Sequence, residues 1–386
     1  MKPLVVVDEN IPWVEHFLGD VAEIRYAAGR SIDAAVLKNA DALLVRSVTR
    51  VDESSLGASH VRFVGSATSG TDHVDLDYLG SRGIAFAYAP GSNANSVVEY
   101  VLAVISAVDD KLEALLAGGR VGLIGYGVIG KMLASRFASL GIDHCVYDPW
   151  LDQSTIDHPA ELEEVLGCDV VTLHAELTSR EPWPSFHLLG EPELLRLKSD
   201  ALMINTSRGP VVDNGALLGL LRDDALGARI VLDVWEGEPQ ISAELLRRVH
   251  YGSPHVAGYS LDGKILATRM LCDRLAEILE LQLPAAASPV SPPAPITVDC
   301  PENEAQLLRQ LLAERYRIGV DDAALRACTL DQPPGNAADA FDRLRREYRQ
   351  RRELPGTRVS GVCLSERQVQ MLLALGCVPD ANGDQA

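Results

Sequence analysis

Charged side chains that could oxidise an alcohol follow three predicted strands in the second half of the sequence. Arg208 follows the apolar run 201–205, and Glu238 comes shortly after the run 228–234. His255 follows a proline. Histidine titrates near neutral pH and can take the hydroxyl proton as a hydride leaves carbon, while a nearby carboxylate orients its ring. Arginine can bind a substrate carboxylate through two hydrogen bonds. We therefore predict that Arg208, Glu238 and His255 are catalytic.

A glycine-rich turn upstream of these residues predicts a dinucleotide site. Gly125, Gly127 and Gly130 form a Gly-x-Gly-x-x-Gly pattern that directly follows a predicted strand and begins a predicted helix. The glycines of this pattern allow a tight turn, the close approach of a pyrophosphate and the packing of the helix on the strand. The N–H groups of the first helical residues, Val128 and Ile129, favour the negative charge of the diphosphate.

Asp148 indicates which dinucleotide is bound. It ends the next predicted strand, 144–148. A carboxylate at this position can accept hydrogen bonds from the adenosine ribose hydroxyls and repels a 2′-phosphate. The sequence therefore favours NAD over NADP as the cofactor.

These residues need strands whose carboxyl ends meet at one edge of a sheet. Residues 1–93 alternate apolar strands with helical stretches, and after a helical stretch at 93–116 the alternation begins again at Gly119. This alternation predicts parallel sheets covered on both faces, and doubly wound sheets bind ligands at the carboxyl ends of their strands. Strands are predicted at 3–8, 41–47, 61–70, 83–90, 120–125, 144–148, 169–174, 201–207 and 228–234.

The composition changes beyond residue 282. The segment 283–296 is rich in Pro and Ala, which predicts a semi-rigid linker. A third unit follows, and its basic run 343–353 is expected to be a solvated helix face or a subunit contact. The predicted fold class is α/β, with two doubly wound, Rossmann-like parallel-sheet domains and a smaller α+β domain at the C-terminus.

The composition also excludes several classes of function. The formal net charge of −19 repels nucleic acid and anionic lipid, so neither is expected as a partner. No apolar run reaches the roughly 18 residues of a membrane helix, and Asp8 follows the first apolar run too soon for a signal peptide. Seven scattered cysteines without a Cys-x-x-Cys pair indicate a reduced, cytoplasmic protein without structural zinc. Hydride chemistry requires no metal, and none is expected.

The segments GYGVIG, INTSRGPVVDN, LDVWEGEP and SPHVAGYS together resemble the D-2-hydroxyacid dehydrogenase family. The resemblance implies that Arg208 is the substrate-binding catalytic arginine, that Glu238 is the acidic partner and that His255 is the acid/base. It also implies a substrate-binding domain of residues 1–93 with 257–282, an NAD-binding domain of residues 94–256, a linker at 283–296 and a C-terminal domain, 297–380, that forms a homodimer.

The segments VRSVTRVDESSL, FVGSATSGTDHVDLDYL and HVAGYSLDGK are similar to members of the family that act on a phosphorylated four-carbon acid. This implies oxidation of 4-phospho-D-erythronate by NAD to 3-hydroxy-2-oxo-4-phosphooxybutanoate, a step of pyridoxal 5′-phosphate synthesis. The substrate contacts implied are Ser47, Thr68 and Tyr259, and Arg46 is a further candidate because a phosphate needs cationic partners. The NAD contacts implied beyond the glycine-rich turn are Asp148, Ala175, Thr206, Ser207, Arg208, Asp233 and Gly258.

Two other functions fit the same residues. Another phosphorylated 2-hydroxyacid dehydrogenase, such as one acting on 3-phosphoglycerate, would use the same catalytic set. A non-catalytic NAD-sensing protein would need only the cofactor site and a docking surface, and the presence of all three catalytic candidates argues against it.

The chain also departs from the family in having Ala175-Glu176 where Thr-Pro is usual, which puts a side-chain contact to NAD there in doubt.

Overall fold

The computed structural model describes residues 2–380 except 69, 286, 331–333 and 362. The described residues cluster into two compact units. Unit 1 contains residues 1–93 and 260–292, and unit 2 contains residues 94–259 and those from 293 onward. The residues of the predicted C-terminal domain therefore cluster with the NAD-binding segment, and Tyr259 belongs to unit 2.

Unit 1 is a five-stranded parallel sheet in the order β2-β1-β3-β4-β5. Successive residues of β1 point to opposite faces, so Val5 and Val7 pack against α12 while Val6 packs on the other side. Both faces are therefore covered, as the apolar strands predict. The elements are β1 (Leu4–Asp8), α1 (Val14–Leu18), β2 (Glu23–Ala27), α2 (Ala34–Leu37), β3 (Ala42–Val45), α3 (Glu53–Leu56), β4 (Phe63–Ser66), α4 (Leu76–Arg82), β5 (Ala85–Tyr88) and α12 (Leu261–Ile278).

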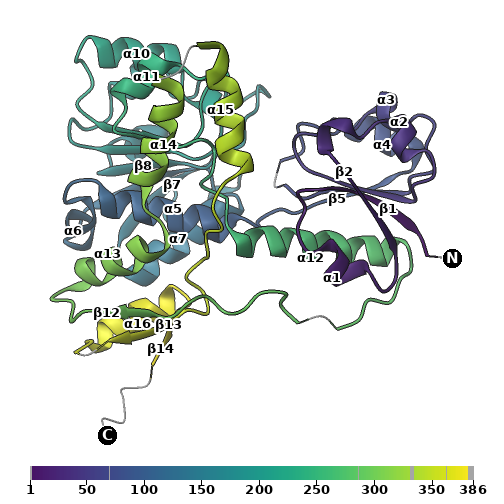
Figure 1. Ribbon diagram of the computed structural model, residues 1–386. Coiled ribbons are helices and arrows are strands. Elements are labelled where there is room, and N and C mark those ends of the chain that lie inside the picture. The colour runs from purple at the N-terminus through teal and green to yellow at the C-terminus, as the bar shows by residue number, and fades with distance from the viewer. Residues whose placement is uncertain (1, 69, 286, 331–333, 362, 381–386) are drawn as a thin grey trace, which may run out of the picture. The chain divides into compact units, whose positions relative to one another are not determined.

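Unit 2 is built on a six-stranded parallel sheet in the order β11-β10-β9-β8-β6-β7. Strands β7 and β8 of this sheet are labelled in Figure 1. The chain order reverses at β6, whose neighbours are β7 and β8, so the glycine-rich turn lies at the switch point where doubly wound sheets bind ligands. The elements are α5 (Ala94–Ala107), α6 (Lys111–Leu116), β6 (Arg120–Ile124), α7 (Val128–Leu140), β7 (Asp143–Tyr147), α8 (Leu162–Leu166), β8 (Val170–Leu173), α9 (Glu191–Leu194), β9 (Leu202–Asn205), α10 (Asn214–Arg222), β10 (Arg229–Leu232), α11 (Ala243–Arg248) and β11 (Tyr251–Gly252).

The helical stretch expected at 93–116 is two helices, α5 and α6. The chain turns between them at Asp109, whose φ of 45° is left-handed. Asp adopts this conformation more readily than most residues, so the paired acids at 109–110 end α5.

The C-terminal segment contributes side chains to the buried clusters on both faces of the unit 2 sheet. Leu307, Leu311 and Leu354 belong to the same buried cluster as α5 and α7, while Leu325 and Phe341 join the cluster of the opposite face. The elements are β12 (Ile296–Val298), α13 (Glu304–Arg315), α14 (Ile318–Leu330), α15 (Pro334–Arg346), β13 (Arg358–Gly361), α16 (Glu366–Ala374) and β14 (Val378–Pro379), with the three strands forming a parallel sheet β12-β13-β14.

The basic run 343–353 differs from its expected form. Helix α15 ends at Arg346, and Arg351 is only 2% exposed, so the expectation of a solvated helix face is wrong for that residue.

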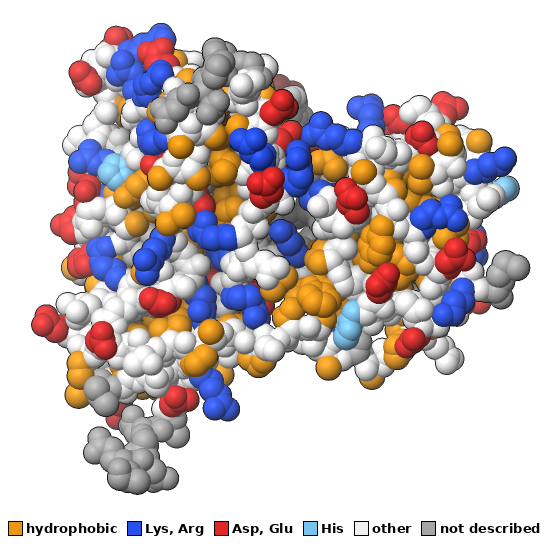
Figure 2. Space-filling view, viewed as in Figure 1, with side chains coloured by type: hydrophobic (Ala, Val, Ile, Leu, Met, Phe, Trp, Pro, Cys, Tyr) orange, Lys and Arg blue, Asp and Glu red, His pale blue; other side chains and the backbone are white. Residues whose placement is uncertain are grey.

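Charged side chains of both signs are interspersed on the face shown in Figure 2, although the chain carries a formal net charge of −19. Among the described residues, no helix has both the length and the hydropathy needed to cross a membrane.

Candidate active site

The three glycines of the turn after β6 have three different surroundings. Gly125 has a φ of 98°, and a Cβ there would lie 2.6 Å from the backbone nitrogen of Ala175. A Cβ on Gly130 would lie 2.1 Å from the carbonyl oxygen of Gly125. A Cβ on Gly127 would meet no atom within 4 Å. The first and third glycines are therefore needed by the fold itself, whereas the space beside Gly127 is open to a ligand.

The start of α7 and the end of β7 complete this part of the site. Gly127 is the N-cap of α7, and no side chain caps the helix. The Asp148 carboxylate accepts hydrogen bonds from the backbone N–H of Tyr126 at 2.8 Å and from that of Trp150 at 3.1 Å. The acid is thus held next to the glycine-rich turn and remains half-buried. An open glycine, an uncapped helix N-terminus and an adjacent carboxylate fit a dinucleotide with its diphosphate and ribose in these places.

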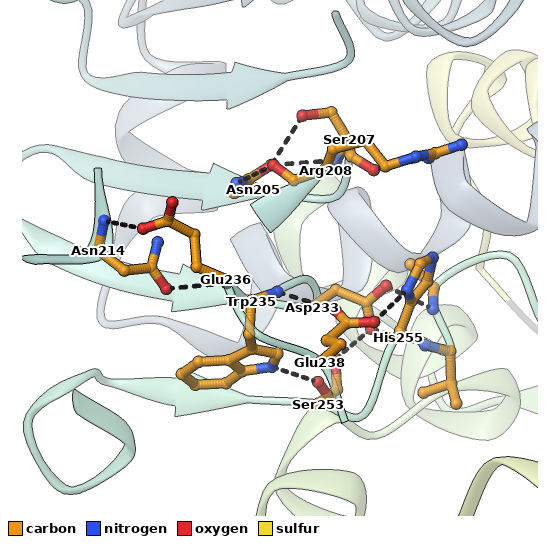
Figure 3. Close-up of polar contacts among 12 residues, drawn as sticks. Asn205, Ser207, Arg208, Asn214, Asp233, Trp235, Glu236, Glu238, Ser253 and His255 are labelled. Carbon is orange, nitrogen blue, oxygen red and sulfur yellow. Dashed lines mark hydrogen bonds and ion pairs between the residues drawn. The ribbon is translucent and has the colours of Figure 1, made fainter. Parts of the chain in front are cut away.

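His255 and Glu238 form a hydrogen-bonded pair beyond the ends of β10 and β11 (Figure 3). The Nδ1 atom of His255 lies 2.8 Å from Oε2 of Glu238, and Oε1 of Glu238 accepts a 2.8 Å bond from the backbone N–H of Trp235. Burial raises the pKa of Glu238, but the hydrogen bond and charge of His255 outweigh it, so this pKa lies below its ordinary value. Glu238 is therefore ionised at neutral pH and accepts the Nδ1 proton.

Asp233 lies behind this pair, at the end of β10. It is 1% exposed and accepts hydrogen bonds from the hydroxyl of Ser253 and from the backbone N–H groups of Val256 and Ala257. Its backbone carbonyl accepts the N–H of His255 at 2.8 Å. Burial raises the pKa of Asp233. Asp233, expected as an NAD contact, thus has both carboxylate oxygens bonded to the loop that carries His255.

Ser253 and Tyr100 were missed by the sequence reasoning, and both support the same loop. The hydroxyl of Ser253 lies 2.7 Å from that of Tyr100, which is fully buried in α5. Trp235 donates its indole N–H to the carbonyl oxygen of Ser253 at 3.0 Å. The only signal in the sequence was the position of Ser253 two residues before His255.

Arg208 follows β9 and is directed to the same side as the ring of His255 in Figure 3. Its turn is held by Asn205, whose side-chain carbonyl accepts from the N–H and the hydroxyl of Ser207, while its NH2 group donates to the Arg208 carbonyl. Arg208 also donates to the carbonyl oxygen of Ser207 at 2.9 Å. The structure thus brings Arg208, Glu238 and His255 together at the carboxyl ends of neighbouring strands.

His174 is a second residue that the sequence reasoning missed. It follows β8, directly before Ala175, and burial lowers its pKa to about 3. Its two ring nitrogens lie 2.9 Å from the Thr172 hydroxyl and 3.3 Å from the Thr206 hydroxyl. Thr206 is 8% exposed. A neutral imidazole therefore connects the ends of β8 and β9, where Ala175 and Thr206 are expected to contact NAD.

The other NAD and substrate candidates differ in exposure. Ser207 is buried, Gly258 and Ala175 are half-buried, and Glu176 is exposed. In unit 1, Ser47 is exposed, and Arg46 lies 3.3 Å from the buried carboxylate of Asp8.

Thr68 belongs to a chain of polar groups in unit 1. Its hydroxyl donates to the Gly70 carbonyl at 2.9 Å and lies 2.7 Å from the hydroxyl of Ser66, which in turn lies 2.9 Å from His73. Asp75 is the N-cap of α4 and accepts a hydrogen bond from the Tyr78 N–H.

A group of metal-binding residue types lies near Glu238 but is held by its own contacts. His187, Asp213 and Glu236 have ligand atoms within 4.8 Å of one another. His187 is 2.7 Å from Glu236, whose other oxygen accepts the N–H of Asn214, while Asp213 caps α10. These bonds tie the segment around Glu236 to the start of α10.

Two family models match the chain. Residues 104–257 match the NAD binding domain of D-isomer specific 2-hydroxyacid dehydrogenases, and residues 289–376 match a domain of unknown function. The matched NAD binding domain contains the glycine-rich turn, Asp148 and the three catalytic candidates.

Individual proteins agree with this result. The chain is 42% identical over 382 residues to erythronate-4-phosphate dehydrogenase of Cellvibrio japonicus, covering 96% of this chain and 98% of that protein. A D-lactate dehydrogenase of Aquifex aeolicus, solved with NAD and lactic acid, has a TM-score of 0.57 at 21% identity and covers 72% of this chain and 95% of its own. An NAD-bound 3-phosphoglycerate dehydrogenase of Entamoeba histolytica has a TM-score of 0.60 at 20% identity. The match covers 72% of this chain and 96% of that protein. The chain is therefore an NAD-dependent oxidoreductase of the D-isomer specific 2-hydroxyacid dehydrogenase family, and within it belongs to the erythronate-4-phosphate dehydrogenases.

Proposed function

We propose that this chain oxidises the C2 hydroxyl of 4-phospho-D-erythronate to give 3-hydroxy-2-oxo-4-phosphooxybutanoate, a step of pyridoxal 5′-phosphate synthesis. The observation that carries the proposal is the 2.8 Å contact between His255 and Glu238 at the ligand-binding edge of the sheet. The chain that holds this pair is 42% identical to the erythronate-4-phosphate dehydrogenase of Cellvibrio japonicus.

The acid/base role follows from the tautomer of His255. Ionised Glu238 accepts the Nδ1 proton, which leaves Nε2 as the basic atom. Nε2 takes the proton of the C2 hydroxyl, and Glu238 stabilises the imidazolium that results. When it is bound, NAD supplies the acceptor for the C2 hydride. In the reverse direction the same imidazolium returns the proton to the carbonyl oxygen.

Arg208 binds the C1 carboxylate and polarises the adjacent oxygen. The residues proposed to hold NAD are Gly125, Gly127, Val128, Ile129, Gly130, Asp148, Ala175, Thr206, Ser207, Arg208, Asp233 and Gly258. For Asp233 this role is indirect, because its oxygens bind the loop of His255. Ser47, Thr68, Tyr259 and Arg46 remain the proposed substrate contacts.

The C-terminal segment is proposed to form a homodimer, and the enzyme is proposed to work in the cytoplasm. Light scattering of the purified chain is expected to give twice the mass of 41.6 kDa. A mass of one chain at micromolar concentration would contradict the dimer.

The function is tested by following NADH formation with 4-phosphoerythronate and 3-phosphoglycerate side by side. A second enzyme that removes the 2-oxo product keeps the oxidation moving forward. A kcat/KM at least tenfold higher for the four-carbon acid is expected. A preference for the three-carbon acid would keep the mechanism and change the substrate. Tight NAD binding with no turnover of either acid would favour a sensor instead.

A further inference from the structure

The C-terminal segment reaches the loop that carries His255. Arg351 is 2% exposed and donates from NH1 to the Ala257 carbonyl at 3.3 Å and from NH2 to the Ser96 carbonyl at 2.5 Å. Ala257 is also the residue whose N–H binds Asp233. Arg351 therefore joins the loop after His255 to the start of α5, and this contact lies entirely within unit 2.

Tyr259, at the end of the same loop, is enclosed by two side chains of this segment. The guanidinium carbon of Arg345 lies 5.8 Å from the centre of the Tyr259 ring. The Tyr348 ring meets it edge-on at 5.8 Å and 83°. Tyr348 donates its hydroxyl to Asp321 at 2.7 Å, and Arg349 pairs with the same carboxylate, so the segment is anchored on α14.

From its place at the Tyr259 ring, Arg345 also acts electrostatically on the Glu238 carboxylate. Burial by itself would lower the pKa of Arg345. The interactions with Tyr259 and Glu238 outweigh burial, so this pKa is raised. Conversely, Arg345 contributes to the lowered pKa of Glu238. The Nε atom of Arg345 is buried and has no hydrogen-bond partner among the described atoms. Among the described residues, His255 and Arg345 act on the charge of Glu238, and Tyr259, Glu238 and Asp233 act on that of Arg345.

We propose that Arg345 is a positioning residue for the His255–Glu238 pair, supplied by the segment that matches a domain of unknown function. Its charge favours ionised Glu238, and its contact with Tyr259 holds the loop of His255. The proposal rests on the acid/base role proposed above. It gives this segment a part in catalysis that is separate from subunit association.

The positive charge of Arg345 determines in which direction its removal should shift the pH profile of kcat/KM. Oxidation requires His255 to accept a proton, so kcat/KM rises with pH along the acidic limb of its profile. Removing a nearby positive charge stabilises the protonated forms of the pair. The acidic limb should then move to higher pH, by about 0.5–1 unit for a partly screened charge.

The test compares the pH profiles of kcat/KM for R345Q, R345K and R346Q with that of the full-length wild-type enzyme. Arg346 is the exposed neighbour on the same helix, so R346Q removes the same charge away from the pair. R345Q is expected to move the acidic limb upward, lowering kcat/KM by about 3- to 10-fold on that limb with less than about twofold change on the plateau. R345K and R346Q are expected to follow the wild-type profile. NADH binding, measured by fluorescence, should be unchanged in all three.

An R345Q profile that coincides with the wild-type one would overturn the proposal, as would equal displacements in R345Q and R346Q or in R345Q and R345K. Thermal unfolding shows whether each variant is folded, and R345M replaces R345Q if the glutamine variant is not. Failure of the wild-type enzyme to oxidise 4-phosphoerythronate would be a failure of the proposed function instead. A second 2-hydroxy acid that is turned over then serves for the same comparison.

Discussion

Each catalytic candidate depends on a neighbour that does no chemistry itself. His255 has a φ of 57°, which a non-glycine residue adopts only when its surroundings hold it there. Here Asp233 binds the N–H groups of the next two residues, and its carbonyl binds the N–H of His255. The buried acid therefore holds the backbone that presents the ring of His255 to Glu238.

His255→Ala should lower turnover by about 10²- to 10⁴-fold, the usual contribution of a positioned general base. NAD affinity should stay within about twofold, because most of the proposed cofactor residues, including the glycine-rich turn and Asp148, lie on other loops. Steady-state kinetics and NADH fluorescence measure the two effects. His60→Ala, an exposed histidine of unit 1, is the matched control. Turnover near the wild-type value in H255A would remove His255 from the mechanism.

At the scale of the element, the turn between β6 and α7 contains one glycine that the fold requires and another whose open side fits a ligand. Gly125 needs its left-handed backbone and lies against Ala175, whereas Gly127 has an ordinary extended backbone and an open side. Glycine is therefore needed at position 125 by the backbone conformation and packing of the chain. At position 127 it leaves space that a bound ligand can fill.

Gly125→Ala and Gly127→Ala should therefore have different effects. The first should lower the stability by about 1–2 kcal/mol from backbone strain alone, with a further loss from the contact with Ala175. The second should leave Tm within about 2 °C but weaken NAD binding by roughly tenfold, or ~1.4 kcal/mol. Thermal unfolding and calorimetric titration with NAD distinguish them. Equal loss of stability in both variants would show that Gly127 is also needed by the fold.

At the scale of the whole molecule, the C-terminal segment shares its core with the NAD-binding sheet. Leu308, Leu312 and Tyr316 are at most 3% exposed and pack in the cluster that contains Tyr100 and Phe137. Burying a large apolar side chain contributes about 1.5–3 kcal/mol, and a whole protein is stable by only about 5–15 kcal/mol. A handful of such residues is therefore comparable with the total stability.

A chain that ends at residue 292 should consequently fail to fold as a cooperative, soluble NAD-binding protein. Circular dichroism on heating should show no sharp transition, or one lowered by more than about 10 °C. A chain that ends at Asp380 is the control and should unfold like the full-length protein. If the chain of residues 1–292 unfolded at the wild-type temperature, the shared core would not contribute to stability.

The sequence by itself determined the parallel α/β class, and it predicted the candidate dinucleotide site and the candidate catalytic set. These depend on local patterns, namely the alternation of strands and helices, the glycine spacing after β6 and Asp148 at the end of β7. Arg208, Glu238 and His255 were predictable because the carboxyl ends of parallel strands meet at one edge.

Only the tertiary structure decided what supports that set. The basic run 343–353 offered no sign that Arg351 would bind Ala257, 94 positions away, or that Arg345 would cover Tyr259. The buried bonds of Asp233 and the neutral His174 were equally hidden. Local patterns decide which elements form, whereas such contacts depend on which side chains the packed elements bring together and remove from water.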